Sequence, residues 1–309
     1  MKNGIVIKNT GSWYYVEDKD SGNICECKLK GKLRLKDIRT TNPIAVGDTV
    51  FFDTDETGSN VIWEIEERKN YIIRRSSNLS KEAHIIAANV DTAFVVATLN
   101  FPITSTEFID RFLVTAEAYN IPAVVILNKC DLYTHEDYQP ILEDFRKIYE
   151  SAGYPVIEVS ATEGTNINYL REYTRNKINL FSGNSGVGKS TLINAVDKTL
   201  TPKTGDISLY HNKGKHTTTF SEMFKMKDGG YIIDTPGIKS FGLVDVEKNE
   251  VGKYFPEIFK FSSNCQYYNC THTHEPGCCV KKAIENVSIA EERYISYLKL
   301  LEDNNQKYR

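Results

Sequence analysis

Residues 183–190 read Gly183-Asn184-Ser185-Gly186-Val187-Gly188-Lys189-Ser190, the Gly-x-x-x-x-Gly-Lys-Ser pattern of a phosphate-binding loop. The apolar run at 178–182 indicates a short buried strand before the loop, and residues 191–196 indicate the start of a helix after it. Glycines let backbone N–H groups converge on a phosphate, and the helix N-terminus adds positive charge there. The pattern predicts that Lys189 reaches the β- and γ-phosphates of a nucleotide and that Ser190 contacts magnesium. The alternative is a glycine-rich turn with an incidental lysine.

The composition fits a soluble globular protein of more than one domain. The chain has 309 residues, 40% of them hydrophobic and 26% charged, and a net charge of −3. This charge argues against a globally basic nucleic-acid-binding protein, so any RNA contact must come from local patches. No apolar run approaches the ~20 residues of a membrane span, and the N-terminus lacks an apolar signal region. We therefore expect a cytoplasmic protein without membrane contact.

Residues 1–70 contain about five short apolar or alternating runs, separated by Gly, Asn, Asp and Ser. This spacing predicts a small β-barrel of the oligonucleotide/oligosaccharide-binding (OB) type, although an SH3-like barrel would give nearly the same pattern. Residues 28–36 place five basic residues without an acid. This stretch is either a phosphate-facing surface or a solvated strand face.

Residues 71–245 alternate between buried strands and helices, which predicts a parallel sheet with helices on both faces and ligands at the carboxyl ends of the strands. The expected strands are 90–97, 123–127 and 156–159, and the expected helices are 106–119, 138–152 and 167–177.

Two motifs at strand ends suit a guanine base. Asn128-Lys129-Cys130-Asp131 follows the strand at 123–127, and Asp131 can accept hydrogen bonds from the ring N–H and the exocyclic amine of guanine. Adenine offers no such pair of donors, so this site would discriminate through satisfied against unpaired polar groups. Ser160-Ala161 follows the strand at 156–159 and could present a backbone N–H to the guanine oxygen. The alternative for the first motif is a turn with a helix cap.

A fourth motif, Asp234-Thr235-Pro236-Gly237, follows the apolar run at 231–233. Asp234 can hold magnesium through water, and the Gly237 N–H can sense the γ-phosphate, although a plain strand-to-turn junction has the same composition. The guanine motifs precede the phosphate loop, whereas most GTPases have the reverse order. A circular permutation explains this order, because it moves the chain ends and leaves the packed sheet unchanged.

Four residues near the C-terminus form Cys-x-x-x-x-Cys-x-His-x-x-x-x-x-Cys: Cys265, Cys270, His272 and Cys278. Three thiolates and one imidazole suit a closed tetrahedral zinc site, which can organise a small region without a large core of its own. Residues 284–301 then predict an amphipathic helix.

Taken together, these features resemble the RsgA/YjeQ family of circularly permuted GTPases that depend on the small ribosomal subunit. The resemblance covers essentially the whole chain, including Gly214-Lys215-His216-Thr217-Thr218-Thr219 and the terminal metal cluster. It implies GTP hydrolysis stimulated by the small ribosomal subunit and a role late in the assembly of that subunit. In the family pattern, Cys279 and His274 are not required as ligands, so we take them as non-ligands.

The resemblance implies three regions: an OB-like, RNA-binding barrel at 1–70, a circularly permuted α/β GTPase domain at 71–245, and a zinc-binding α-helical region at 246–309. The implied partners are GTP or GDP and the small ribosomal subunit with its rRNA, and we expect a monomer.

Residues 201–219 occupy the position of the first switch, where Thr218 is our candidate for a magnesium ligand. Ile238 stands where many GTPases have a glutamine that orients the attacking water. His216 is the nearest candidate for that role, and its alternatives are contact with ribosomal RNA or exposure to solvent.

The expected catalytic residues are Lys189 and His216, and magnesium would be held by Ser190, Thr218 and, through water, Asp234. The expected GTP-binding residues are Asn128, Lys129, Asp131, Ser160, Ala161, Gly183, Asn184, Ser185, Gly186, Val187, Gly188, Lys189, Ser190, Thr191, Asp234 and Gly237. One rival function is a nucleotide-gated RNA-binding scaffold with incidental hydrolysis. A second, a nucleic-acid enzyme with catalytic zinc, is disfavoured because four protein ligands leave no open position on the metal.

Overall fold

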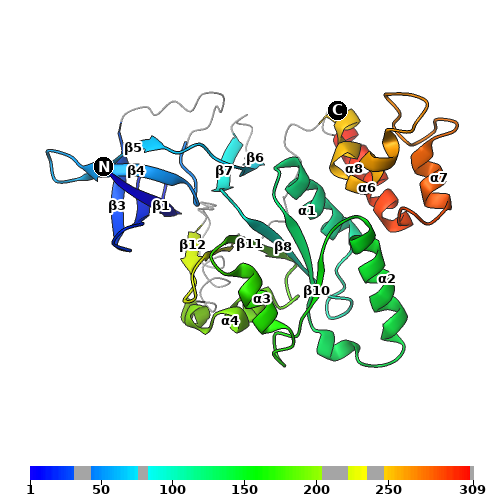
Figure 1. Ribbon diagram of the computed structural model, residues 1–309, viewed down its shortest axis with the longest axis horizontal. Coiled ribbons are helices and arrows are strands. Elements are labelled where there is room, and N and C mark those ends of the chain that lie inside the picture. Colours follow the sequence, from blue (N-terminus) through cyan, green and yellow to red (C-terminus); the bar gives the residue numbers. More distant parts are fainter. Residues whose placement is uncertain (31–42, 76–82, 204–221, 235–246, 307–309) are drawn as a thin grey trace. The chain divides into compact units, whose positions relative to one another are not determined.

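The computed structural model describes residues 1–30, 43–75, 83–203, 222–234 and 247–306 (Figure 1). They form two compact units. The first comprises Met1–Ala93, Arg171–Ser182 and Asp197–Ser240, and the second comprises Phe94–Leu170, Gly183–Val196 and Phe241–Arg309. No helix in these described ranges is long and apolar enough to cross a membrane.

The first unit begins with a five-stranded barrel. Its strands are β1 (Lys2–Asn9), β2 (Tyr14–Asp18), β3 (Ile24–Leu29), β4 (Thr49–Thr54) and β5 (Asn60–Ile65). They pair in the order β1-β2-β3-β5-β4, and β4 pairs back with β1, so the ring is closed. The β3–β5 pairing is parallel and the others are antiparallel. Closure leaves no open strand edge and confirms the predicted barrel.

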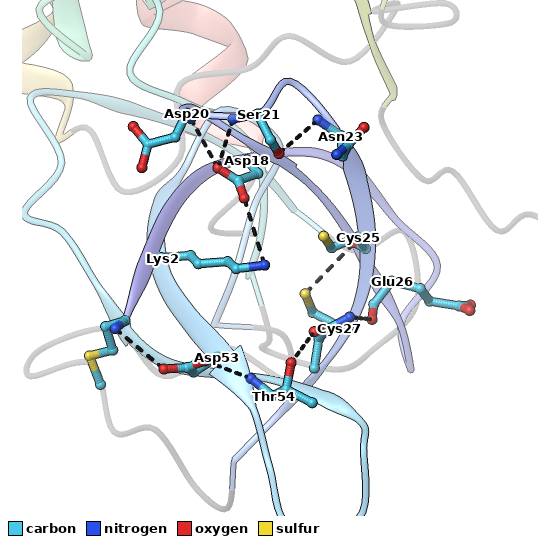
Figure 2. A network of polar contacts seen from close by, with 12 residues as sticks. Lys2, Asp18, Asp20, Ser21, Asn23, Cys25, Glu26, Cys27, Asp53 and Thr54 are labelled. Atoms are coloured by element: carbon cyan, nitrogen blue, oxygen red, sulfur yellow. Dashed lines mark hydrogen bonds and ion pairs between the residues drawn. The ribbon is translucent and has the colours of Figure 1, made fainter.

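Alternation along these strands places apolar side chains inside the ring. The barrel core contains Val6, Tyr14, Val16, Cys27, Ile44, Val50, Phe52 and Ile62. At the rim, Lys2 lies 4.0 Å from Asp18, and the N-terminal amino group lies 3.3 Å from Asp53 (Figure 2).

The rest of the first unit contains a separate two-stranded sheet and strands that continue the sheet of the barrel. A separate hairpin pairs β6 (Tyr71–Arg75) with β7 (Ala83–Ala88). Strand β11 (Ile178–Gly183) is parallel to β13 (Tyr231–Asp234), which is antiparallel to β12 (Glu222–Lys225). Lys8 of β1 is in register with Glu222 of β12, and their side chains form an ion pair of 3.3 Å. The short helix η2 (Lys198–Lys203) follows the phosphate-binding loop and its helix.

The second unit contains β9 (Ala123–Leu127), β10 (Val156–Glu158) and most of β8 (Thr92–Ala97). Strands β9 and β10 are parallel, and every residue of β8 and β9 is buried. Their near-continuous apolar runs are typical of strands covered on both faces. The helices are α1 (Thr106–Ala118), η1 (Cys130–Tyr133), α2 (Tyr138–Ser151), α3 (Ile167–Thr174, which continues into the first unit) and α4 (Lys189–Val196).

The C-terminal region of the second unit contains η3 (Lys248–Tyr254), α6 (Pro256–Ser262), α7 (Cys279–Glu285) and α8 (Glu291–Gln306). The prediction of one helix over 284–301 is wrong, because α7 ends at Glu285 and α8 starts at Glu291. Between them, Val287 has a left-handed backbone (φ 57°), which ends a right-handed helix. Ile289, in this connection, is buried in the same core as Tyr297 of α8.

Candidate nucleotide site and metal cluster

The phosphate-binding loop follows β11 directly, and α4 begins at Lys189. Gly186 and Gly188 have left-handed φ values of 87° and 85°, which favour glycine. A Cβ atom on Gly188 would lie 2.6 Å from Nδ2 of Asn128, and one on Gly183 would lie 2.8 Å from the carbonyl oxygen of Val96. Backbone conformation therefore favours glycine at 186 and 188, and close packing favours it at 183 and 188.

Asn128 connects three of the predicted motifs. Its Nδ2 donates to the carbonyl oxygen of Val187 in the phosphate-binding loop at 2.9 Å. Its Oδ1 accepts from the backbone N–H of Ala161 at 3.3 Å. The side chain is buried, with 1% exposed, so both bonds are shielded from water. Segments at 128, 161 and 187 therefore meet at one place although they are far apart in sequence.

Lys129 adds a second link. Its backbone is left-handed, with φ 66°, and its Nζ donates to the carbonyl oxygen of Gly186 at 2.8 Å and to that of Phe101. Nearby in the chain, Oδ1 of Asp131 is shielded from solvent and has no hydrogen-bond partner among the described residues. A shielded carboxylate oxygen without a donor is unusual in a folded protein, and a ligand that brings donors would satisfy it.

Ser160 stabilises the loop that carries Ala161. Its hydroxyl accepts from the backbone N–H of Glu163 at 3.1 Å and lies 3.1 Å from the hydroxyl of Thr162. The Ser160 side chain therefore orders this turn, while the Ala161 N–H points to Asn128.

The other expected nucleotide-site residues fall into two groups. Lys189, Ser190 and Thr191 form the first turn of α4. Asp234 is the last residue of β13, where its backbone is in register with Phe181, two residues before the start of the phosphate-binding motif. Gly237, Ile238, His216 and Thr218 lie outside the described residues.

Cys265, Cys270, His272 and Cys278 come together as a group that could hold a metal ion, with one ligand atom of each within 4.8 Å of the others. The Sγ atoms of Cys265 and Cys278 are 3.9 Å apart, and Nδ1 of His272 lies 3.7 Å and 3.4 Å from them. Tetrahedral zinc would separate two sulfur ligands by about 3.8 Å and sulfur from nitrogen by about 3.6 Å, from the usual bond lengths. The donor set and its spacing therefore fit a tetrahedral metal.

Neighbouring residues hold this cluster in shape. The Tyr294 hydroxyl donates to the carbonyl oxygen of His272, and the Tyr297 hydroxyl donates to that of Thr271, both at 2.7 Å. Burial raises the pKa of Glu275, but hydrogen bonds from Thr271 and Thr273 outweigh it and hold the pKa at about 2. Glu275 is thus an ionised acceptor that organises the loop between the ligands.

Cys279 and His274 stand outside the cluster. The Cys279 thiol donates to the carbonyl oxygen of Asn264 at 2.9 Å, and Nδ1 of His274 lies 2.9 Å from the Thr273 hydroxyl.

Sequence reasoning missed a buried ion-pair network beside this region. Arg293 of α8 is fully buried, with its Nε donating to Glu257 of α6 and its Nη1 to Asp110 of α1, both at 2.7 Å. The signal was present, because Arg293 falls between Ile289 and Tyr297 at helical spacing on the apolar face. A basic residue in that position requires an acidic partner inside the protein.

Comparisons with known proteins agree with this architecture. A family model described as RsgA GTPase matches residues 65–244, and one described as RsgA N-terminal domain matches residues 3–62. The small ribosomal subunit biogenesis GTPase RsgA 2 of Bacteroides thetaiotaomicron is 58% identical over 99% of this chain and 98% of its own. The small ribosomal subunit biogenesis GTPase RsgA of Flavobacterium psychrophilum is 51% identical over 99% and 94%.

Two solved structures are similar over nearly the whole chain. The crystal structure of YjeQ from Thermotoga maritima matches with a TM-score of 0.79 and 38% identity, covering 98% of each chain. The structure of YloQ, a circularly permuted GTPase, matches with a TM-score of 0.77 and 28% identity, covering 99% of this chain and 96% of that one. The order of motifs around the phosphate-binding loop agrees with this permutation. The chain belongs to the RsgA GTPase family and is a circularly permuted GTP hydrolase.

Proposed function

We propose that this protein hydrolyses GTP to GDP and phosphate when the small ribosomal subunit stimulates it, late in the maturation of that subunit. The observation that carries the nucleotide site is the bridge made by Asn128, which joins the phosphate-binding loop to the Ser160-Ala161 turn. The partner follows from relatives named for small ribosomal subunit biogenesis at 51–58% identity.

Guanine would bind between the segments that Asn128 and Lys129 link. The Asp131 carboxylate accepts from the ring N–H and the exocyclic amine, and the Ala161 N–H exchanges its long bond to Asn128 for the guanine oxygen. The bonds from Lys129 to Gly186 and Phe101 hold its aliphatic stem beside the base.

The phosphates would lie over residues 183–191, where backbone N–H groups and Lys189 would neutralise their negative charge. Ser190, Thr218 and, through water, Asp234 would hold magnesium, and Gly237 would donate to the γ-phosphate. Bound magnesium supplies positive charge between the β- and γ-phosphates. Gly183 and Gly188 pack closely against Val96 and Asn128, which supports the loop shape that this binding needs.

In the reaction, a water oxygen forms a bond to the γ-phosphorus while the bond to the β,γ-bridging oxygen breaks. The water loses a proton, and inorganic phosphate and GDP leave. Ile238 cannot orient that water because its side chain makes no hydrogen bonds. We assign the positioning role to His216, whose imidazole can accept a hydrogen bond from water.

We further propose that the metal at the Cys3His cluster is a structural zinc ion, because all four positions are filled by protein ligands. We assign the barrel to residues 1–70, the GTPase domain to 71–245 and the zinc region to 246–309. The barrel and zinc region would contact rRNA, and the protein would act as a cytoplasmic monomer.

Turnover of GTP by the purified protein, with and without purified small ribosomal subunits, tests this proposal. We expect strong stimulation by small subunits and none by large ones. Equal, slow turnover under all conditions would overturn the proposal and favour the RNA-binding scaffold, in which hydrolysis is incidental.

Two variants test the site itself. Lys189→Ala removes the phosphate-binding cation, so we expect loss of GTP binding in a fluorescent-nucleotide titration. Asp131→Asn replaces an acceptor with an amide, so we expect weaker discrimination of GTP from ATP and ITP. Unchanged binding by Lys189→Ala, or unchanged selectivity by Asp131→Asn, would contradict the respective assignment.

A further inference from the structure

Both tryptophans of this protein lie on the outer surface of the barrel, and each is covered by a lysine. Nζ of Lys28 is 4.5 Å from the ring centroid of Trp13, and Nζ of Lys30 is 3.0 Å from that of Trp63. Both lysines are exposed and both rings are partly buried. We call Trp13, Lys28, Lys30 and Trp63 the aromatic–lysine face.

Strand pairing places these four residues on one side of the sheet. Tyr14 of β2 is in register with Cys27 of β3, so Trp13 falls opposite Lys28 one step further along the pair. Leu29 of β3 is in register with Ile62 of β5, so Lys30 falls opposite Trp63.

Alternation along β3 decides which way the face points. Cys27 is fully buried in the barrel core, so Glu26, Lys28 and Lys30 point outward. Figure 2 shows this alternation, with Cys27 inside the ring of strands and Glu26 directed away from it. Neither tryptophan is part of the barrel core.

We propose that the aromatic–lysine face binds an unpaired, extended segment of RNA. Two bases would stack on Trp13 and Trp63, while Lys28 and Lys30 leave the rings and contact phosphates. Aromatic rings stack on any base, and lysines beside them supply the sequence-independent attraction to the backbone. The proposal rests on the proposed ribosomal function and names the form of RNA that the barrel takes.

The spacing of the two tryptophans along the sheet is wider than that of stacked bases in a duplex. Trp13 and Trp63 are separated by two strand spacings across the sheet and by two residues along it, which amounts to about 12 Å between Cα atoms. Neighbouring bases in a duplex are only about 3.4 Å apart along each strand. Two rings at this distance can serve two bases only if the strand between them is extended.

The outward row of β3 is basic at Lys28 and Lys30 and acidic at Glu26. The Glu26 carboxylate accepts from the Tyr15 hydroxyl at 3.2 Å. Nε1 of Trp63 is shielded and has no hydrogen-bond partner in the described ranges, so Trp63 keeps an unsatisfied donor that bound RNA could satisfy.

Intrinsic tryptophan fluorescence tests the proposal in the full-length protein, because all tryptophan emission comes from Trp13 and Trp63. The protein is titrated with a twelve-nucleotide oligouridylate and with an RNA hairpin of equal length. We expect the oligouridylate to quench the emission and the hairpin to quench it less at equal concentration. Single Trp13→Leu and Trp63→Leu variants keep one reporter each, and we expect affinity roughly 5- to 100-fold weaker in each, as for loss of one stacked base.

Lysine variants keep the test decisive if a tryptophan variant fails to fold. Lys28→Gln/Lys30→Gln removes two phosphate contacts, which lowers the slope of log K against log salt by about 1.4. Lys2→Gln/Lys19→Gln changes the same net charge elsewhere on the barrel and should leave the slope within error. Emission unaffected by oligouridylate, equal quenching by the hairpin, or equal slopes for the two lysine variants would overturn the proposal.

Turnover stimulated by small subunits is measured in parallel with the wild-type protein. Stimulation without quenching would overturn the RNA site and leave the ribosomal function standing. Quenching without stimulation would support the RNA site and overturn the ribosomal function.

Discussion

The guanine and phosphate-loop segments of the nucleotide site lie in the same compact unit as the C-terminal region with its Cys3His cluster, but the two are held together differently. At the nucleotide site, side chains mostly bond to the backbone, as Asn128 does to Val187 and Ala161. In the C-terminal region, side chains contact other side chains, over a short stretch of sequence in the Cys3His cluster and over long separations in the network of Arg293.

The difference shows which region is preformed. The phosphate-binding loop owes its shape to its own backbone, through left-handed glycines and bonds to carbonyl oxygens. In the cluster, three thiols and one imidazole lie within reach of one another, and a bound metal would tie together the segments that carry them. We therefore expect the C-terminal region to depend on its ligand for folding, and the nucleotide site to be independent of it.

Removal of the metal is expected to have the largest effect. A structural zinc contributes about 10–16 kcal/mol in small zinc-binding peptides, so a chelator should abolish hydrogen-exchange protection over 265–285. Affinity for GDP should stay within about twofold, since sites without shared partners behave independently. Hydrogen-exchange protection that survives chelation would contradict the expectation that the C-terminal region depends on its metal for folding.

Cys270→Ser and Cys279→Ser provide a matched pair for the same question. Cys270 belongs to the cluster, whereas the Cys279 thiol bonds to the carbonyl oxygen of Asn264. We expect Cys270→Ser to lose the bound metal and Cys279→Ser to keep one equivalent, as measured by metal analysis of the purified proteins.

The second-largest expected effect is the loss of stability when Arg293 is replaced. Its replacement by alanine leaves Asp110 and Glu257 buried without their cation, which should lower the free energy of unfolding by about 3–5 kcal/mol. Lys299→Ala is the control, because Lys299 joins the same two helices, α8 and α1, through an exposed pair with Glu107 at 3.0 Å. This control should lose less than about 1 kcal/mol in urea unfolding. Similar losses in both variants would show that the buried network does not stabilise the region.

The contrast also explains what could be predicted from the sequence. Local sequence patterns predicted the phosphate-binding loop, Asn128–Asp131 and the parallel sheet. Such predictions work because the same local pattern gives the same backbone conformation in different proteins. The spacing of the four cysteine and histidine residues predicted a metal site for the same reason. The position of Arg293 on an apolar face indicates that it needs a buried acidic partner, but the sequence does not identify Glu257 and Asp110, because they lie 36 and 183 residues away.

Two further features could not be predicted from local sequence patterns. The apolar periodicity over 284–301 continued through the break between α7 and α8, because Ile289 faces the same core as both helices. Strand patterns alone could not separate the two barrel types, whereas the closed order of pairing defines the ring. The roles predicted for His216 and Thr218 stay predictions, since both residues lie outside the described ranges.

A smaller effect is expected at the bridge in the nucleotide site. Asn128→Ala removes one donor and one acceptor from a buried place, which should weaken GDP binding by about 1–3 kcal/mol. Asn166→Gly is the control, because it removes a single exposed bond to the Glu158 carbonyl oxygen and its left-handed backbone tolerates glycine. Calorimetric titration with GDP should separate the two variants, and equal affinities would place the organising contact elsewhere.

The smallest effects should come from the tyrosines that support the metal loop. Tyr297→Phe removes a hydrogen bond to the Thr271 carbonyl oxygen from a ring that is only 3% exposed, which should lower the free energy of unfolding by about 1 kcal/mol. Tyr294→Phe removes an equally short bond, but Tyr294 is only partly buried, so water can replace the hydroxyl and the loss should be smaller. Urea unfolding of the metal-loaded proteins gives both values. Equal losses would show that burial does not control the strength of these bonds, whereas no loss in either variant would show that the metal fixes the loop without help from α8.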